Sequence, residues 1–151
     1  MDEMERRVEV FLRSYRTAFE HLDLAQIAAH FAFPLQVATD AGEIAVSVVP
    51  TVADWLPQVE RLAGAYRTIG MRSAHPEETI MEVVSPRLLQ VRVRWRLLDG
   101  AGAALYEFNA GYTLAEVQGG LRIVALAHDE LPRLRARLAQ AESAASARRS
   151  P

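Results

Sequence analysis

Two residue types are missing from this sequence of 151 residues, which has no cysteine and no lysine. Without cysteine there can be no disulfide, no thiolate zinc or iron–sulfur site and no cysteine nucleophile. Without lysine, Schiff-base chemistry and a lysine-dependent phosphate-binding loop are excluded. All 17 basic residues are therefore arginines. These two absences remove several large classes of enzyme.

The sequence also lacks a strong charge of one sign and any long apolar segment. Its net charge of −2 and its pI near 6.1 give no reason to expect a nucleic-acid partner. The N-terminus, MDEMERRVEV, is charged where a signal peptide would be apolar, and no apolar run approaches the length of a membrane span. We therefore expect a cytoplasmic protein with neither a nucleic-acid nor a membrane partner.

What is present is the composition of a globular domain. Half of the residues are hydrophobic and 24% are charged, which is typical of folded soluble domains. The length fits one domain. We expect a single domain over residues 1–142, followed over 143–151 by an Ala-, Ser- and Arg-rich tail that is frayed or disordered.

The N-terminal part of the sequence has helical periodicity. Apolar residues recur every three or four positions over 4–22, which predicts an amphipathic helix. A second, short helix is predicted over 24–31, because Asp23 and Gln26 have the spacing of a helix-capping pair. This helix has to end before Pro34, since the residue ahead of a proline avoids helical backbone angles.

A short strand pair and a third helix are predicted next. The strands cover 35–38 and 43–48 and flank a turn. The helix covers 51–69, and its Pro57 is best tolerated in the first turn, where the missing N–H loses no intrahelical partner. We therefore expect Asp54 to be the N-cap residue of this helix.

The second half of the sequence has the periodicity of strands. Residues 88–98 alternate between apolar and polar side chains, as a half-buried strand does. A two-residue loop at 100–101 would lead into a return strand over 103–115 and would place Trp95 opposite Tyr106. The other elements expected are strands over 71–85 and 121–127 and a C-terminal helix from about 129.

This order of elements indicates an α+β domain with its helices on one face of a curved antiparallel sheet. The sequence also has particular positions in common with a known superfamily. These positions are residues 23–31, Pro34, Trp95, 99–102, Tyr112 and 119–123. On these residues, and over about 4–129 as a whole, the chain resembles the nuclear transport factor 2-like superfamily, which includes SnoaL-like and ketosteroid isomerase-like proteins.

The resemblance implies a cone-shaped domain, in which N-terminal helices pack on the concave face of the sheet and leave a pocket between them. It also implies a homodimer formed through the outer face of the sheet. Members of the superfamily include both enzymes and binding modules, so the fold by itself does not decide the function.

Three functions stay open. The first is a small-molecule-binding pocket protein, dimeric and without turnover, that takes a hydrophobic ligand. The second is a cofactor-independent isomerase, dehydratase or cyclase that uses His, Tyr and Asp side chains for acid–base catalysis. The third is a protein-interaction module. No cofactor is predicted for any of them.

The candidate catalytic residues are those that could form an acid–base pair. His30 with Tyr15, or His128 with Asp129, would supply such a pair. Isomerase-like members of the superfamily carry a carboxylate on the first strand, but Asp40 falls in the turn after this strand, where aspartate is common.

Each of these candidates has a structural alternative. Tyr15 would equally serve as a core residue, and His30 would be favoured at the end of a helix by the helix dipole. His128 shares the outer sheet face with Asn109 if the preceding turn is tight, whereas a bulge would turn it inward. Asp129 would also serve as the N-cap of the last helix.

Inward-facing aromatic side chains are expected to line a ligand pocket, although the same side chains would fill a closed core. No metal site is predicted, because no His, Asp and Glu residues have a recognised ligand spacing. The expected ligand-binding residues are Tyr15, Phe19, His30, Trp95, Phe108 and Tyr112.

Overall fold

The computed structural model describes residues 2–149, which form four helices and one six-stranded sheet. The helices are α1 (Glu3–Glu20), α2 (Leu24–Ala29), α3 (Val52–Ile69) and α4 (Leu131–Arg149). The strands are β1 (Phe31–Asp40), β2 (Ile44–Val49), β3 (Met71–Ser85), β4 (Leu88–Asp99), β5 (Ala104–Val117) and β6 (Gly120–His128).

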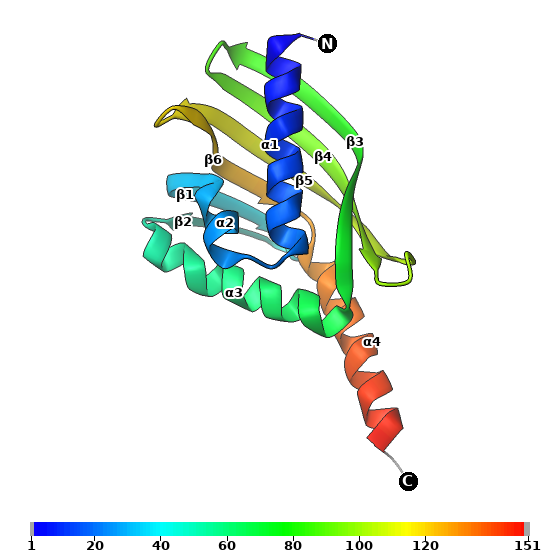
Figure 1. Ribbon diagram of the computed structural model, residues 1–151. Coiled ribbons are helices and arrows are strands. Elements are labelled where there is room, and N and C mark those ends of the chain that lie inside the picture. The colour runs from blue at the N-terminus through cyan, green and yellow to red at the C-terminus, as the bar shows by residue number, and fades with distance from the viewer. Residues whose placement is uncertain (1, 150–151) are drawn as a thin grey trace.

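The sheet is curved, and α1, α2 and α3 lie against one of its faces (Figure 1). Its strand order is β2-β1-β6-β5-β4-β3, and every neighbouring pair is antiparallel except β1 and β6, which are parallel. The predicted α+β architecture is confirmed. The core lies between the helices and the sheet, and its most deeply buried side chains include Ile27, Leu35, Leu89, Leu114 and Ile123.

Helix α1 forms where the apolar periodicity predicted it. Its N-terminus is capped by Asp2, whose carboxylate accepts a hydrogen bond of 2.8 Å from the backbone N–H of Glu5. The buried residues recur every three or four positions, so one stripe of the helix faces the sheet. This stripe consists of Val8, Phe11, Leu12, Tyr15 and Ala18.

Helix α3 begins earlier than expected. Its N-cap is Thr51 and not Asp54, because the two residues form a capping box in which each side chain accepts a hydrogen bond from the other's backbone N–H. Pro57 therefore lies inside the helix and not in its first turn. The two reciprocal bonds stabilise the helix start, whereas the proline removes a single backbone donor.

The hairpin between β4 and β5 has a different register from the one predicted. Trp95 lies opposite Phe108 and not opposite Tyr106, because the connecting loop is longer than two residues. The Asp99 carboxylate holds this loop by accepting hydrogen bonds of 2.9 Å from the backbone N–H groups of Ala101 and Ala103. The shift is by two residues, so each side chain keeps the sheet face on which it was expected.

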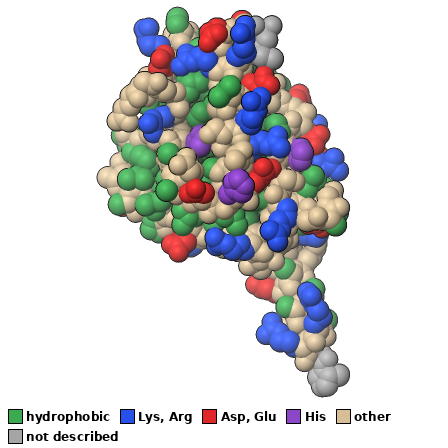
Figure 2. Space-filling view, viewed as in Figure 1, with side chains coloured by type: hydrophobic (Ala, Val, Ile, Leu, Met, Phe, Trp, Pro, Cys, Tyr) green, Lys and Arg blue, Asp and Glu red, His purple; other side chains and the backbone are tan. Residues whose placement is uncertain are grey.

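Helix α4 extends away from the rest of the molecule and ends at Arg149 (Figure 1). It is helical beyond Ser143, where fraying was expected, while residues 150 and 151 of that expected tail lie outside the described residues. Arginines are visible along α4, and arginines and acidic residues are interspersed on the body (Figure 2). Within residues 2–149, none of the helices combines the length and the apolar character that crossing a membrane requires.

Candidate functional site

A cavity of about 270 Å³ lies between the concave face of the sheet and helices α1 and α3. Helix α3 presents to it Trp55, Val59, Leu62 and Tyr66, which are spaced by three or four residues and so share one face. Most of the remaining lining is aromatic or aliphatic. These other lining side chains include Tyr15, Phe19, Phe31, Val37, Met71, Trp95, Leu97, Phe108, Tyr112 and Leu126.

Glu130 brings a carboxyl group into this apolar wall. Its side chain is buried, and its Oε2 accepts hydrogen bonds from the hydroxyls of Tyr66 at 2.6 Å and Tyr106 at 2.8 Å. Burial raises the pKa of Glu130 to about 7, although the two tyrosine hydrogen bonds act in the opposite direction. The other oxygen, Oε1, has no protein partner among the described residues, so the carboxyl group still has an unused acceptor in the cavity wall.

Three further aromatic residues interact through their polar groups in the cavity wall, Trp95 and Tyr112 from the sheet and Tyr15 from α1. The indole Nε1 of Trp95 donates to the hydroxyl of Tyr112 at 2.8 Å. Burial raises the pKa of Tyr15 well above its ordinary value, and its hydroxyl also interacts with that of Tyr112. Both tyrosine hydroxyls are therefore neutral at physiological pH, when they can donate as well as accept hydrogen bonds.

His128 points toward the cavity because strand β6 contains a bulge. Pairing between β5 and β6 shifts by one residue between Thr113 and Leu114, which places His128 opposite Ala110 rather than Asn109. Both His128 and Ala110 line the cavity. Of the two orientations that the sequence allowed, the structure therefore has the inward one.

The protonation pattern of His128 follows from its hydrogen bonds. Its Nδ1 accepts from the backbone N–H of Glu130 at 3.2 Å, so the ring proton resides on Nε2, which donates to the hydroxyl of Thr39 at 3.2 Å. Burial lowers the pKa of His128, so the neutral ring dominates at neutral pH.

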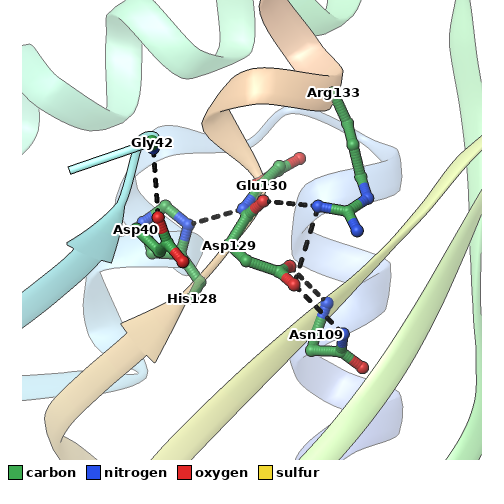
Figure 3. Close-up of polar contacts among 7 residues, drawn as sticks. All are labelled: Asp40, Gly42, Asn109, His128, Asp129, Glu130 and Arg133. Atoms are coloured by element: carbon green, nitrogen blue, oxygen red, sulfur yellow. Dashed lines mark hydrogen bonds and ion pairs between the residues drawn. The ribbon is translucent and has the colours of Figure 1, made fainter. Parts of the chain in front are cut away.

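Asp129 faces away from the cavity. Its carboxylate accepts from the backbone N–H of Asn109 at 2.7 Å and from the Asn109 side chain at 3.1 Å, and it lies 3.6 Å from the guanidinium of Arg133. Figure 3 shows the Asp129 carboxylate directed toward Asn109 and in contact with Arg133, whereas the Glu130 side chain extends on the other side of Asp129 from Asn109. Asp129 is not the N-cap of α4 either, because the first helical hydrogen bond, from the N–H of Leu134, goes to the carbonyl of Glu130.

His30 lies behind the cavity wall and not in its lining. Its ring packs edge-on against Phe11 and Tyr15, with ring centroids 5.3 and 5.5 Å apart. Its two nitrogens contact the backbone carbonyl of Gln26 at 2.6 Å and the hydroxyl of Ser14 at 2.9 Å. The expected pairing of His30 with the Tyr15 hydroxyl is therefore not formed, because neither nitrogen is directed toward it.

The remaining expected site residues divide into two groups. The cavity brings together the aromatic residues Tyr15, Phe19, Trp95, Phe108 and Tyr112. Asp40 is the exposed last residue of β1, directly before the turn where it was expected, and its carboxylate accepts from the backbone N–H of Gly42 at 3.0 Å (Figure 3). In the part of the chain that the structure describes, no three His, Asp or Glu side chains are grouped in a way that could hold a metal ion.

Sequence reasoning missed Glu130. A signal for it was present, because Glu130 follows His128 by two positions and, if the extended chain continued, both would face the same side. A bulge that turns His128 inward therefore brings Glu130 inward as well. At this end of β6 only His128 and Asp129 were expected to be site residues.

Comparison with a family model identifies the chain as similar to NTF2-like protein (DUF6841) over residues 2–131. None of the curated proteins matches the sequence. Many solved structures do match, and their similarity to this chain is one of fold.

Aln2 from a Streptomyces species is 18% identical with a TM-score of 0.67, over 85% of this chain and 91% of that one. A protein of unknown function from Mycobacterium tuberculosis is 15% identical with a TM-score of 0.63, over 93% and 89%. A domain of unknown function with a cystatin-like fold from Nostoc punctiforme is 16% identical with a TM-score of 0.63, over 99% and 100%. The superfamily resemblance expected from the sequence is confirmed.

Proposed function

This chain belongs to the family of NTF2-like proteins (DUF6841), and we propose that its cavity binds one predominantly apolar small molecule. The NTF2-like fold supports a small-molecule-binding domain. The volume of about 270 Å³ and the aromatic lining suit a compact ring system. An open cavity of this kind favours ligand binding over the alternative of a purely protein-interacting module, which would have a filled interior.

The buried carboxyl group of Glu130 is the main support for this proposal. A buried carboxyl group costs free energy unless its oxygens have partners. Tyr66 and Tyr106 satisfy Oε2 and leave Oε1 without a protein donor among the described residues. A ligand hydroxyl or N–H at that position would complete the set, so the ligand is an apolar molecule with one hydrogen-bond donor.

Acid–base catalysis is a second candidate function, and the pKa of Glu130 favours it. A general acid or base works best when its pKa lies near the working pH, and the carboxyl group of Glu130 has a pKa of about 7. The tyrosine hydroxyls and the neutral His128 ring in the same wall would then orient the ligand. Turnover of this kind would need no cofactor.

A calorimetric titration with two matched probes tests the binding proposal. Para-hydroxybiphenyl offers an apolar body and one O–H donor, whereas para-methoxybiphenyl has the same body without the donor. We expect the phenol to bind more tightly by about tenfold, the contribution of one hydrogen bond to a carboxyl group.

Two variants of neighbouring residues complete this test. Glu130→Gln replaces the ionisable acceptor and is expected to reduce the preference for the phenol. Asp129→Asn makes the same chemical change at a carboxylate that faces Asn109 instead of the cavity, so the preference should persist. Failure of both probes to bind, or an equal preference in both variants, would contradict the proposal.

The outer face of the sheet at β2 supports a homodimer as part of the same proposal. β2 is an edge strand, and its outward residues Ile44, Val46 and Val48 are 70%, 61% and 62% exposed. Beside Val46 on this face lie the small side chains of Ala38 and Ala127. An apolar row next to small side chains allows the sheet of a second copy to approach closely.

A further inference from the structure

Ser14, His30 and Gln26 form a second polar arrangement, outside the cavity. The hydroxyl of Ser14 lies 2.9 Å from Nε2 of His30, and Nδ1 of His30 lies 2.6 Å from the backbone carbonyl of Gln26. A carbonyl only accepts hydrogen bonds, so Nδ1 carries the ring proton. Nε2 is therefore the acceptor, and the Ser14 hydroxyl donates to it.

Packing fixes the orientation of the His30 ring, so that its Nε2 can act as a base toward Ser14. It is 8% exposed and packs between the rings of Phe11 and Tyr15. Burial lowers the pKa of His30, and the nearby charge of Arg122 acts in the same direction, whereas the Gln26 carbonyl acts against both. The ring is neutral at pH 7, which is the form that can take a proton from a serine.

Ser14 itself is accessible. It is exposed on α1 and lines a surface hollow of about 360 Å³, separate from the cavity. Arg13 and Thr17 line the same hollow and carry N–H and O–H donors, one of which the Arg13 guanidinium shares with Glu9 at 3.4 Å. His30 does not line this hollow, so the base lies beneath the serine and shielded from solvent.

We propose that Ser14 is a nucleophile with His30 as its general base, and that it accepts the acyl group of small activated esters. The arrangement has the three required parts, which are a nucleophile, a base within hydrogen-bond reach and a group that orients the base. Exposure of the serine in an open surface hollow gives a small activated ester direct access to it. Such a reaction at Ser14 is independent of the function proposed for the cavity.

The proposed acyl transfer needs no cofactor. Ser14 Oγ forms a bond to the ester carbonyl carbon while its proton passes to Nε2 of His30. The bond from that carbon to the leaving oxygen then breaks, and His30 returns the proton to the departing alkoxide. The product is an ester of Ser14, which water hydrolyses in a second step. Thr17 and Arg13 would stabilise the negative charge that develops on the carbonyl oxygen.

Acetylation by para-nitrophenyl acetate tests the proposal on the intact protein. The sequence has no lysine, so the usual competing side-chain amines are absent. Mass spectrometry of the digested protein would compare the acetylation of Ser14 with that of Ser47, which is also exposed but has no histidine partner among the described residues. We expect Ser14 to react faster by at least about a hundredfold, the lower range for general-base assistance.

Two variants assign the roles. Ser14→Ala should abolish acetylation in the peptide that contains residue 14, and His30→Gln should slow the acetylation of Ser14 to the rate seen at Ser47. Because His30 is buried and its replacement could unfold the protein, the pH profile of the wild type is a second readout. The rate should fall as the pH drops through a pKa below 6.5. Equal reactivity of Ser14 and Ser47, or a rate at Ser14 independent of both His30 and pH, would overturn the proposal.

Discussion

Glu130 gains most of its negative charge only above about pH 7, because burial raises the pKa of its carboxyl group. In the unfolded chain the same group titrates near 4.5. Between these two values the folded state binds more protons than the unfolded state, so stability falls as the pH rises. The loss over this window is roughly 3 kcal/mol at 1.36 kcal/mol for each pKa unit.

Glu130→Gln should remove this dependence. Urea denaturation of the wild type and the variant at pH 4.5 and pH 8 gives the difference in their free energies of unfolding. We expect the variant to gain stability relative to the wild type at the higher pH, since glutamine does not ionise. Asp129→Asn is the control. An identical difference at both pH values would show that Glu130 titrates as an exposed residue does.

The two tryptophans of the chain differ in a way that stability measurements can detect. Both line the cavity, but the N–H of Trp95 donates to Tyr112, whereas that of Trp55 is covered and has no partner among the described residues. Trp95→Phe removes a satisfied hydrogen bond, and Trp55→Phe removes a donor that contributes none.

We therefore expect Trp95→Phe to reduce the free energy of unfolding by about 1–2 kcal/mol more than Trp55→Phe does. Chemical denaturation of both variants measures this, and the similar loss of ring volume makes each variant a control for the other. A larger loss for Trp55→Phe would mean that its N–H has a partner in solution.

At the scale of single elements, the helices show how far local sequence determines structure. The periodicity of α1 and the glycine after α3 were sufficient to place these helices, since Gly70 takes the left-handed conformation (φ 77°) that ends a helix. The start of α3 was misplaced by three residues. The energetic cost of a proline inside a helix favoured a start at Asp54. The capping box formed by Thr51 and Asp54 is the stronger signal, and it starts the helix at Thr51.

This capping box can be tested within one helix. Thr51→Ala should cost about 1 kcal/mol of stability, because it removes the side-chain acceptor of the Asp54 N–H at 3.4 Å and the O–H donor to the Asp54 carboxylate at 2.7 Å. Thr68→Ala makes the same change in the last turn of α3, where it removes only an exposed hydrogen bond of 3.0 Å to the Gly64 carbonyl and introduces a better helix former, so it should cost much less. Thermal or urea unfolding compares the two. Equal effects would show that the cap is not formed in solution.

The strands show where local sequence is insufficient. Alternation assigned the correct face to Trp95 and Phe108, but the pairing of β4 with β5 depends on how Asp99 holds the loop. The bulge in β6 likewise has no local signal, because its position depends on packing against β5. Since this bulge brings His128 to the cavity, part of the candidate site could not be predicted from sequence alone.

At the scale of the whole molecule, the parallel pairing of β1 with β6 joins the first strand of the sequence to the last. It aligns Thr39 with His128 and closes one side of the cavity. Contacts between residues so distant in sequence are not encoded by any periodicity. The superfamily resemblance predicted the overall shape of the domain. The polar groups that line the cavity could be identified only from the three-dimensional structure.

The proposed homodimer is also a property of the whole molecule. Val46→Glu places a charge in the exposed apolar row of β2 and should convert a dimer into a monomer, as measured by light scattering after size-exclusion chromatography. Val10→Glu is the control, because Val10 is 60% exposed but lies on α1, away from the outer sheet face. A monomeric wild type, or a dimer that tolerates Val46→Glu, would contradict this interface.

The most direct test of the binding function follows Glu130 itself. The ¹³C chemical shift of its carboxyl group, recorded against pH with and without para-hydroxybiphenyl, reports both its burial and its contact with ligand. We expect a pKa of about 7 in the free protein, and a lower value with the phenol because a donated hydrogen bond favours the charged carboxylate. A pKa near 4.5 that the phenol leaves unchanged would contradict a ligand site at Glu130.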